Sequence, residues 1–237
     1  MEEKVILVTG ATGSLGRVVV KRLLENGAKV VAFYRTRERL EELASFIGEM
    51  SSGMKGFQGD ATDEASVGNF VKVAIETYGR IDAIVNLVGG YSGGSDVHET
   101  DQNLWDSMMN LNLRSAFLCS KAVTPQMISQ NYGKIINVAA RTAVERGRRS
   151  RSGAYAVAKA GVIVLTETMA EELRRFEINV NCILLSTMDT PANRRDFPKA
   201  DFFRWVNPRD VAEVILFLVS NASLTISGAS IPVYGKA

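Results

Sequence analysis

The stretch that decides the fold is KVILVTGATGSLGRVVVKRLLENG, residues 4–27. Its first part, 4–10, is an apolar run rich in β-branched residues, which is typical of a buried strand. From residue 14 onward, apolar residues recur at helical spacing as far as Gly27, and glycine is a common residue at a helix end. The stretch therefore predicts a strand, a tight turn and a helix at the start of an α/β sheet.

The turn between strand and helix carries Gly10, Gly13 and Gly16, a G-x-x-G-x-x-G spacing. Glycine lets the backbone turn sharply and lie close to a ligand, and the N-terminus of the following helix attracts phosphate. Because the three glycines follow a strand and open a helix within the first thirty residues, they predict a loop that binds the pyrophosphate of a dinucleotide.

The end of the second predicted strand indicates which dinucleotide is preferred. An acidic residue there usually binds the ribose diol of NAD, whereas an arginine accommodates the 2′-phosphate of NADP. Residues 32–40 read AFYRTRERL, with Arg35 and Arg37 at the turn and no acidic residue before Glu38. The sequence favours NADP(H), with NAD as the alternative.

The same alternation of apolar runs and helical patterns continues along the chain. Further strands are predicted at 28–34, 55–59, 81–90, 133–140, 178–185 and 228–235, and helices at 37–48, 63–79, 103–130, 153–176 and 208–220. Pro125 predicts a kink or a boundary within 103–130. The strands are apolar nearly throughout, as expected when helices cover both faces of a sheet. The prediction is one domain over 1–237, a Rossmann-type α/β fold with a doubly wound parallel sheet of about seven strands and helices on both faces.

Composition excludes several classes of protein. The 237 residues carry 28 basic and 26 acidic side chains, so the net charge of +2 gives no general attraction to nucleic acid or to a membrane surface. No apolar run is long enough to span a bilayer. Cys119 and Cys182 lie in apolar stretches outside any CxxC pair, which favours reduced thiols and a cytoplasmic location. His98 is the only histidine, so no metal site is predicted. A small-molecule substrate remains as the expected partner.

A tyrosine and a lysine lie four residues apart in the predicted helix 153–176. Residues i and i+4 share a helix face, so Tyr155 and Lys159 are expected to be neighbours. An ammonium beside a phenol favours the phenolate and should lower the pKa of Tyr155 from its usual value near 10. The pair is therefore a candidate proton donor and acceptor near neutral pH.

Taken together, these motifs resemble the short-chain dehydrogenase/reductase family over essentially the whole chain. TGATGSLG (9–16) is similar to its TGxxxGxG loop with Ser14 at the middle glycine, NLVG (86–89) is similar to its NNAG motif, and Tyr155 and Lys159 match its YxxxK pair. The resemblance implies that Asn112, Tyr155 and Lys159 are catalytic and that the protein is a homodimer or homotetramer. The cofactor-binding residues that it implies are Gly10, Thr12, Gly13, Ser14, Leu15, Gly16, Arg35, Asp60, Ala61, Asn86, Val88, Gly89, Tyr155, Lys159, Met188 and Thr190.

One departure from the family narrows the expected substrate. The family has a serine where this chain has Ala140, and Thr142, two residues further on, is a candidate to replace its hydroxyl. The quinoid dihydropteridine reductases also have a small residue there, and they resemble this chain in the segments GGYSGG (89–94) and MDTPANRRDFPKADFFRW (188–205). The resemblance implies an NAD(P)H-dependent reductase with dihydropteridine reductase-like activity. The alternatives are a reductase of another carbonyl or imine and a non-catalytic nucleotide-binding regulatory protein.

Two further groups of side chains lie near the expected substrate site. The first is a set of five arginines, either recruiting an anionic substrate or solvated at the surface: Arg141, Arg146, Arg148, Arg149 and Arg151. The second is a set of aromatic residues, either contacting a flat substrate ring or packing in the ordinary way: Tyr91, Trp105, Phe202 and Trp205.

Overall fold

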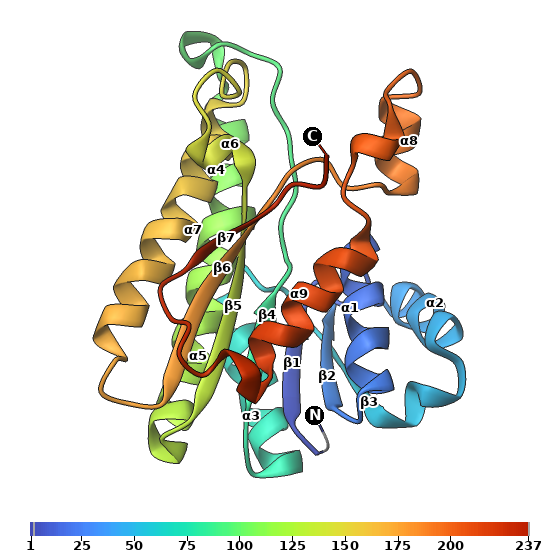
Figure 1. Ribbon diagram of the computed structural model, residues 1–237, viewed down its shortest axis with the longest axis vertical. Coiled ribbons are helices and arrows are strands. Elements are labelled where there is room, and N and C mark those ends of the chain that lie inside the picture. Colours follow the sequence, from blue (N-terminus) through green and yellow to red (C-terminus); the bar gives the residue numbers. More distant parts are fainter. Residues whose placement is uncertain (2, 237) are drawn as a thin grey trace.

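The computed structural model describes residue 1 and residues 3–236. Its sheet contains seven parallel strands in the order β3-β2-β1-β4-β5-β6-β7 (Figure 1). The strands are β1 Val5–Thr9, β2 Lys29–Tyr34, β3 Met54–Gln58, β4 Ala83–Asn86, β5 Gly133–Ala140, β6 Ile178–Leu185 and β7 Ser230–Val233. The predicted Rossmann-type parallel sheet is confirmed.

Helices cover both faces of the sheet, as the apolar strands require. The helices are α1 Ser14–Glu25, α2 Arg37–Ile47, α3 Glu64–Tyr78, α4 Gln102–Met109, α5 Ser115–Gln130, α6 Arg141–Val144, α7 Gly153–Glu172, α8 Pro191–Asp196 and α9 Pro208–Val219. One core packs α1, α2 and α9 against the sheet, and a second core packs α3, α5 and α7 against the other face. Val8 belongs to the first core and Leu7 to the second, as expected for a strand buried on both sides.

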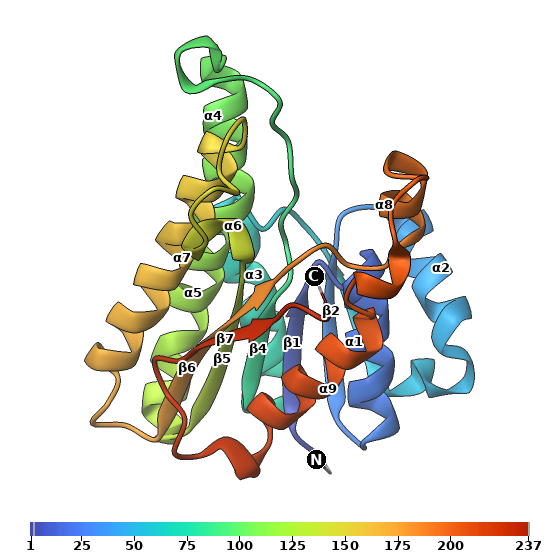
Figure 2. The ribbon, with the colours of Figure 1, turned by 45° about the horizontal axis from the view of Figure 1, so that its top comes forward.

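The strand order reverses beside β1, and this positions the site. β1 pairs with β2 on one side and with β4 on the other, so Thr9 lies opposite both Phe33 and Asn86. In open parallel sheets, ligands bind outside the carboxyl ends of the strands at such a reversal. Figure 2 shows this edge, with α4, α6 and the start of α7 on one side, α8 on the other, and the C-terminus between them.

The long helical pattern at 103–130 is divided, but not at the predicted place. Pro125 lies inside α5, which continues to Gln130. Its lost hydrogen bond is tolerated because the buried side chains of α5 hold the helix against the sheet. The irregularity lies instead at 110–114, one turn of π-helix between α4 and α5. Such turns are frequent at functional sites, and this one contains Asn112.

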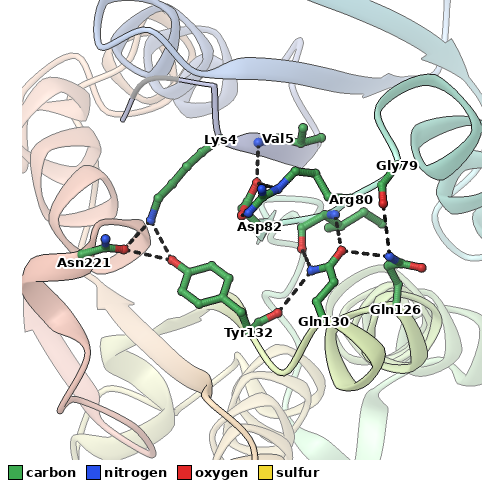
Figure 3. A network of polar contacts seen from close by, with 10 residues as sticks. Lys4, Val5, Gly79, Arg80, Asp82, Gln126, Gln130, Tyr132 and Asn221 are labelled. Carbon is green, nitrogen blue, oxygen red and sulfur yellow. Dashed lines mark hydrogen bonds and ion pairs between the residues drawn. The ribbon is translucent and has the colours of Figure 1, made fainter.

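The opposite, amino edge of the sheet is closed by polar contacts (Figure 3). The buried carboxylate of Asp82 accepts hydrogen bonds from the Val5 N–H and from the Arg80 guanidinium. Lys4 Nζ donates to Tyr132 Oη and to Asn221 Oδ1, both at 2.6 Å. These contacts join the start of β1 to the ends of α3, α5 and α9, at the edge away from the predicted site.

Among residues 1 and 3–236, no helix is long and apolar enough to cross a membrane. The same residues contain no group of three or more His, Cys, Asp or Glu side chains placed to hold a metal ion.

Candidate active site

The glycine loop between β1 and α1 is shaped for close approach of a ligand. Gly10 has a φ of 62°, in the left-handed region. Its carbonyl accepts a hydrogen bond from the Gly13 N–H at 3.0 Å, which closes a tight turn. A Cβ at Gly16 would lie 2.1 Å from that same carbonyl oxygen, so only glycine fits. Helix α1 has no side-chain cap and no acidic residue in its first turn. Its first amide groups are therefore suited to a phosphate, and the predicted residues Thr12, Ser14 and Leu15 lie at this turn.

The end of β2 and the loop after β3 carry the predicted cofactor-binding residues Arg35, Asp60 and Ala61. Arg35 Nη2 lies 3.1 Å from Asp60 Oδ2, and the Arg35 side chain is 79% exposed. The N–H and hydroxyl of Thr62 both donate to Asp60 Oδ1 and, with Arg35, lower the pKa of Asp60. The predicted residue Ala61 is buried beside them. Arg35 is therefore accessible to an anionic group while Asp60 is held as a carboxylate.

The loop after β4 is held by a residue that the sequence analysis missed. Thr9 Oγ1 accepts hydrogen bonds from the N–H groups of Leu87 and Val88, at 3.1 and 3.4 Å. The threonine of the TG dipeptide was the signal that could have identified it. In contrast, the side chain of Asn86 is turned into the core, where its Nδ2 donates to Ser120 and Asn137. The side chain of Asn86 therefore joins β4 to α5 and β5 beneath the site.

The three predicted catalytic residues come together at the carboxyl edge. Lys159 Nζ donates to the Val138 carbonyl at 2.8 Å and lies 5.9 Å from the centre of the Tyr155 ring. Asn112 forms a two-way clasp with Gly90, accepting from its N–H at 3.1 Å and donating to its carbonyl at 3.0 Å. A Cβ at Gly89 would lie 2.9 Å from Asn112 Oδ1 and 3.2 Å from Lys159 Nζ. Gly89 is therefore required for the close packing of this cluster.

The protonation of the pair differs from the expectation. Burial raises the pKa of Tyr155 to about 12, with a further contribution from Tyr91, and burial lowers the pKa of Lys159 to about 8. The expectation that Lys159 lowers the pKa of Tyr155 is wrong for this structure, because the ammonium bonds to a carbonyl and does not offset the desolvation of the phenol. Tyr155 consequently holds its proton at neutral pH.

The strand that ends beside Tyr155 provides no hydroxyl. β5 ends at Ala140, which is 6% exposed. Thr142 follows in α6, and its Oγ1 is buried without a hydrogen-bond partner among the described residues. The carbonyls of Thr142 and Ala143 accept hydrogen bonds from the guanidinium of Arg149, at 3.1 and 2.8 Å. One arginine of the 141–151 set therefore braces the turn that follows Ala140.

Two more of these arginines are engaged within the protein. Arg141 and Arg148 each form an ion pair of 2.7 Å with Glu145 and lower the pKa of that carboxyl group. The Arg141 guanidinium also lies over the ring of Tyr234, 4.9 Å from its centre. Arg146 and Arg151 are exposed. We call residues 141–153 the α6 wall of the site.

Residues 188–205, which include α8, lie on the other side of the carboxyl edge (Figure 2) and are called the α8 wall. The predicted residue Thr190 caps α8 by accepting from the Asn193 N–H, and Asn193 Nδ2 donates to the Met188 carbonyl. Asp189 and Arg194 form a bidentate ion pair. Trp205 packs on Phe202 at 4.8 Å, so these two aromatic rings contact one another.

The tail after β7 joins the two walls. The Tyr234 carbonyl accepts from Ser186 Oγ at 2.8 Å, and the Tyr234 ring lies beneath Arg141 of the α6 wall. Lys236 and Arg204 exchange hydrogen bonds, from the Lys236 N–H to the Arg204 carbonyl and from Arg204 Nε to the Lys236 carbonyl. Arg204 belongs to the α8 wall, so the tail contacts both sides of the site.

A glycine loop shaped for a phosphate and a tyrosine beside a lysine, at the reversal of a parallel sheet, are typical of oxidoreductases of the dinucleotide-binding α/β class. The family model described as short chain dehydrogenase matches residues 4–201. The chain belongs to the short-chain dehydrogenase family and is an oxidoreductase of that family.

Three known proteins show the extent of the similarity. The 3-oxoacyl-acyl-carrier-protein reductase of Thermotoga maritima is 31% identical over 243 residues, covering 99% of this chain and 98% of its own. A variant of actinorhodin polyketide ketoreductase solved with NADPH has a TM-score of 0.90 at 25% identity, covering 99% and 98%. An NAD⁺-bound xylitol dehydrogenase has a TM-score of 0.90 at 28% identity, also covering 99% and 98%.

Proposed function

We propose that this chain is an NADP(H)-dependent reductase of a small conjugated substrate, of the quinonoid dihydropteridine type. The observation that supports it best is the cluster of Tyr155, Lys159 and Asn112 beside a strand that ends in Ala140. A conjugated, electron-poor ring spreads the incoming charge over several atoms. Such a substrate requires a proton donor but no hydroxyl aimed at a single oxygen.

The residues of the glycine loop and of the β2 end fit a bound dinucleotide phosphate. Gly16 lets the start of α1 lie close to the Gly10 carbonyl, the first turn of α1 has no side-chain cap, and Arg35 is exposed beside Asp60. Arg35 would pair with the 2′-phosphate of NADP, and NAD is the alternative cofactor. Solved relatives contain NADPH in one case and NAD⁺ in another. When bound, the nicotinamide supplies the hydride.

The side chains around the substrate then have distinct roles. Tyr155, whose pKa is raised to about 12, remains protonated and donates its proton to the ring nitrogen that gains electron density. Lys159, fixed on the Val138 carbonyl, holds a positive charge 5.9 Å from the ring of that tyrosine and stabilises the phenolate that forms. Asn112 keeps Gly90 and the loop after β4 in place through its two hydrogen bonds.

A second candidate is the reduction of a ketone. It is favoured by the printed names of two relatives, the Thermotoga maritima 3-oxoacyl reductase and the polyketide ketoreductase. It is also favoured by the hydroxyl groups of Tyr91 and Ser152, since the Tyr91 ring packs against the ring of Tyr155.

The decisive experiment follows the oxidation of NADPH and of NADH by absorbance. One assay supplies a quinonoid dihydropterin generated in situ, and a parallel assay supplies a panel of ketones. We expect turnover of the pterin with a preference for NADPH. Turnover of ketones alone would replace the first proposal by the second, and no turnover with either class would refute the reductase function.

We also propose a cytoplasmic homodimer or homotetramer. Phe117 on α5 and Val164 on α7 are 43% and 60% exposed, which is high for large apolar side chains. A groove of about 360 Å³ lies beside them and is lined by Met109, Asn110, Leu113, Arg114, Phe117 and Leu165. Light scattering of the purified protein and fractionation of expressing cells test the two parts, and a monomer in solution would refute the first.

A further inference from the structure

The glycine-rich loop after β4 is fastened to the segment that begins α7. The Gly94 N–H donates to the Arg151 carbonyl at 2.7 Å. A Cβ at Gly93 would lie 2.6 Å from that carbonyl oxygen and 2.9 Å from the hydroxyl of Tyr91, so only glycine fits there. Arg151 has a φ of 58°, a left-handed value that is uncommon outside glycine. The loop is therefore held against the first turn of the helix that carries Tyr155.

Two hydroxyl groups meet at this contact. Tyr91 Oη lies 3.1 Å from Ser152 Oγ. The ring of Tyr91 meets the ring of Tyr155 edge to face, with centres 5.2 Å apart and planes at 90°. Ser152 precedes α7 by one residue and lies three positions before Tyr155, so it faces the same side of the helix. The hydroxyl pair is therefore adjacent to the phenol that donates the proton.

The hydroxyl groups of Tyr91 and Ser152 together have one O–H that can donate a hydrogen bond to a ligand. Each hydroxyl carries one proton, and the hydrogen bond between them uses only one of the two. Ser152 occupies the cap position of α7, where serine usually bonds to a free amide, yet its side chain makes no capping bond. Tyr91 is 60% exposed. One O–H of the pair is thus uncommitted to the described residues and open to a ligand.

We propose that the Tyr91–Ser152 pair donates this hydrogen bond to the carbonyl oxygen of a ketone substrate, supplying the hydroxyl that Ala140 lacks. The inference rests on the proposed reductase function and assigns residues to its ketone branch. The pair donates a hydrogen bond and transfers nothing. The hydride of the reduced nicotinamide goes to the carbonyl carbon, the proton of Tyr155 goes to the oxygen, and the products are the alcohol and the oxidised nicotinamide.

The test uses the full-length protein and the ketone that wild type reduces best. The variants are Tyr91→Phe, Ser152→Ala, the two combined, and the combination with Ala140→Ser. Each single variant leaves one hydroxyl in place, so the double variant should show the largest loss, about 10²–10³-fold in kcat, which is typical for a missing oxyanion donor. Its KM should change little, and its turnover of a quinonoid dihydropterin should change less than about fivefold, since charge on that ring is spread out. Ala140→Ser should restore ketone turnover at least tenfold.

The controls separate this role from a structural one. Tyr132→Phe removes a hydrogen-bonded tyrosine hydroxyl at the opposite edge of the sheet, and it should leave kcat unchanged. NADPH binding, followed by quenching of protein fluorescence, should be the same in the double variant and in wild type. Thr142→Val tests the other nearby hydroxyl and should leave ketone turnover near the wild-type rate.

Three results would overturn the inference. The first is a double variant that keeps its ketone turnover or loses pterin turnover equally. The second is a loss of ketone turnover in Thr142→Val that exceeds the loss in the double variant. The third is a wild type that reduces the pterin and no ketone, which leaves the reductase function standing. If wild type reduces neither substrate, the proposed function and this inference both fail.

Discussion

Replacement of Gly16 by alanine tests the phosphate loop, on which the cofactor site depends. A Cβ there would lie 2.1 Å from the Gly10 carbonyl oxygen and 2.7 Å from the Ala11 carbonyl oxygen. Both neighbours are backbone atoms, so no side-chain rotation relieves the contact. Gly10 itself lies close to the loop after β4, since a Cβ built on it would be 2.9 Å from the carbonyl carbon of Leu87. The loop must therefore open if the fold is kept.

The size of the effect follows from two opposing contributions. Overpacking a close contact typically costs about 1–3 kcal/mol, and alanine is favoured over glycine within a helix by roughly 1 kcal/mol. Because the contacts are with backbone, we expect the upper part of the range and a net loss of about 1–2 kcal/mol. For a chain of this length the loss corresponds to a Tm lowered by about 2–8 °C. Displacement of the loop amides should weaken NADPH at least tenfold, about 1.4 kcal/mol.

Gly13→Ala is the matched control for this prediction. A Cβ at Gly13 would meet only the Gly10 carbonyl oxygen, at 3.2 Å, and its φ of −73° suits any residue. Its Tm should therefore stay close to that of wild type. Thermal unfolding followed by circular dichroism, with NADPH titrations, compares the three proteins. A Gly16→Ala protein with wild-type Tm and affinity, or one more stable than Gly13→Ala, would refute this account of the loop.

Three other predictions concern single side chains. Tyr155→Phe should lower kcat about 10²–10⁴-fold in steady-state assays and leave NADPH binding intact; full activity would show that another group donates the proton. Arg35→Ala should weaken NADPH about 10–100-fold in binding titrations, since a bond to a charged group is worth roughly 1.5–3 kcal/mol; an equal loss for NADH would remove the argument for NADP. Burial and the nearby Lys4 lower the pKa of Lys134 from 10.5 to about 8 in the folded protein. The charged form of Lys134 therefore destabilises the fold below about pH 8. This destabilisation disappears as the pH rises toward 10.5, where the side chain is neutral in the folded protein and loses its proton in the unfolded chain as well. The stability of wild type relative to Lys134→Met, from urea denaturation, should accordingly rise by about 2–3 kcal/mol between about pH 7 and pH 10; a constant difference would contradict this assignment.

Much of the fold was predictable because local and long-range signals agree. The glycine loop 10–16, the apolar strands and the regular alternation with helices all indicate the same parallel sheet. The π-helical turn at 110–114 was missed because its residues continue the helical pattern of the sequence on both sides. Pro125 was misleading because burial of α5 outweighs one lost hydrogen bond.

The site was predictable to a lesser extent. Spacing and resemblance together indicated Tyr155, Lys159 and Asn112, which the structure places in one cluster. The raised pKa of Tyr155 could not be predicted, since it depends on the burial of the phenol in the folded protein and on the nearby Tyr91. The direction of the Asn86 side chain could not be predicted either, because a sequence motif does not show which core residues a side chain will hydrogen-bond.

The short tail at 234–236 has a consequence for anyone who engineers this protein. Its single tyrosine ring supports Arg141, and two residues later its backbone is paired with Arg204. A change in the sequence of either the α6 wall or the α8 wall would therefore disturb the tail, which contacts the other wall as well. Variant libraries that aim at a new substrate preference should change residues of both walls together and keep residues 234–236 constant.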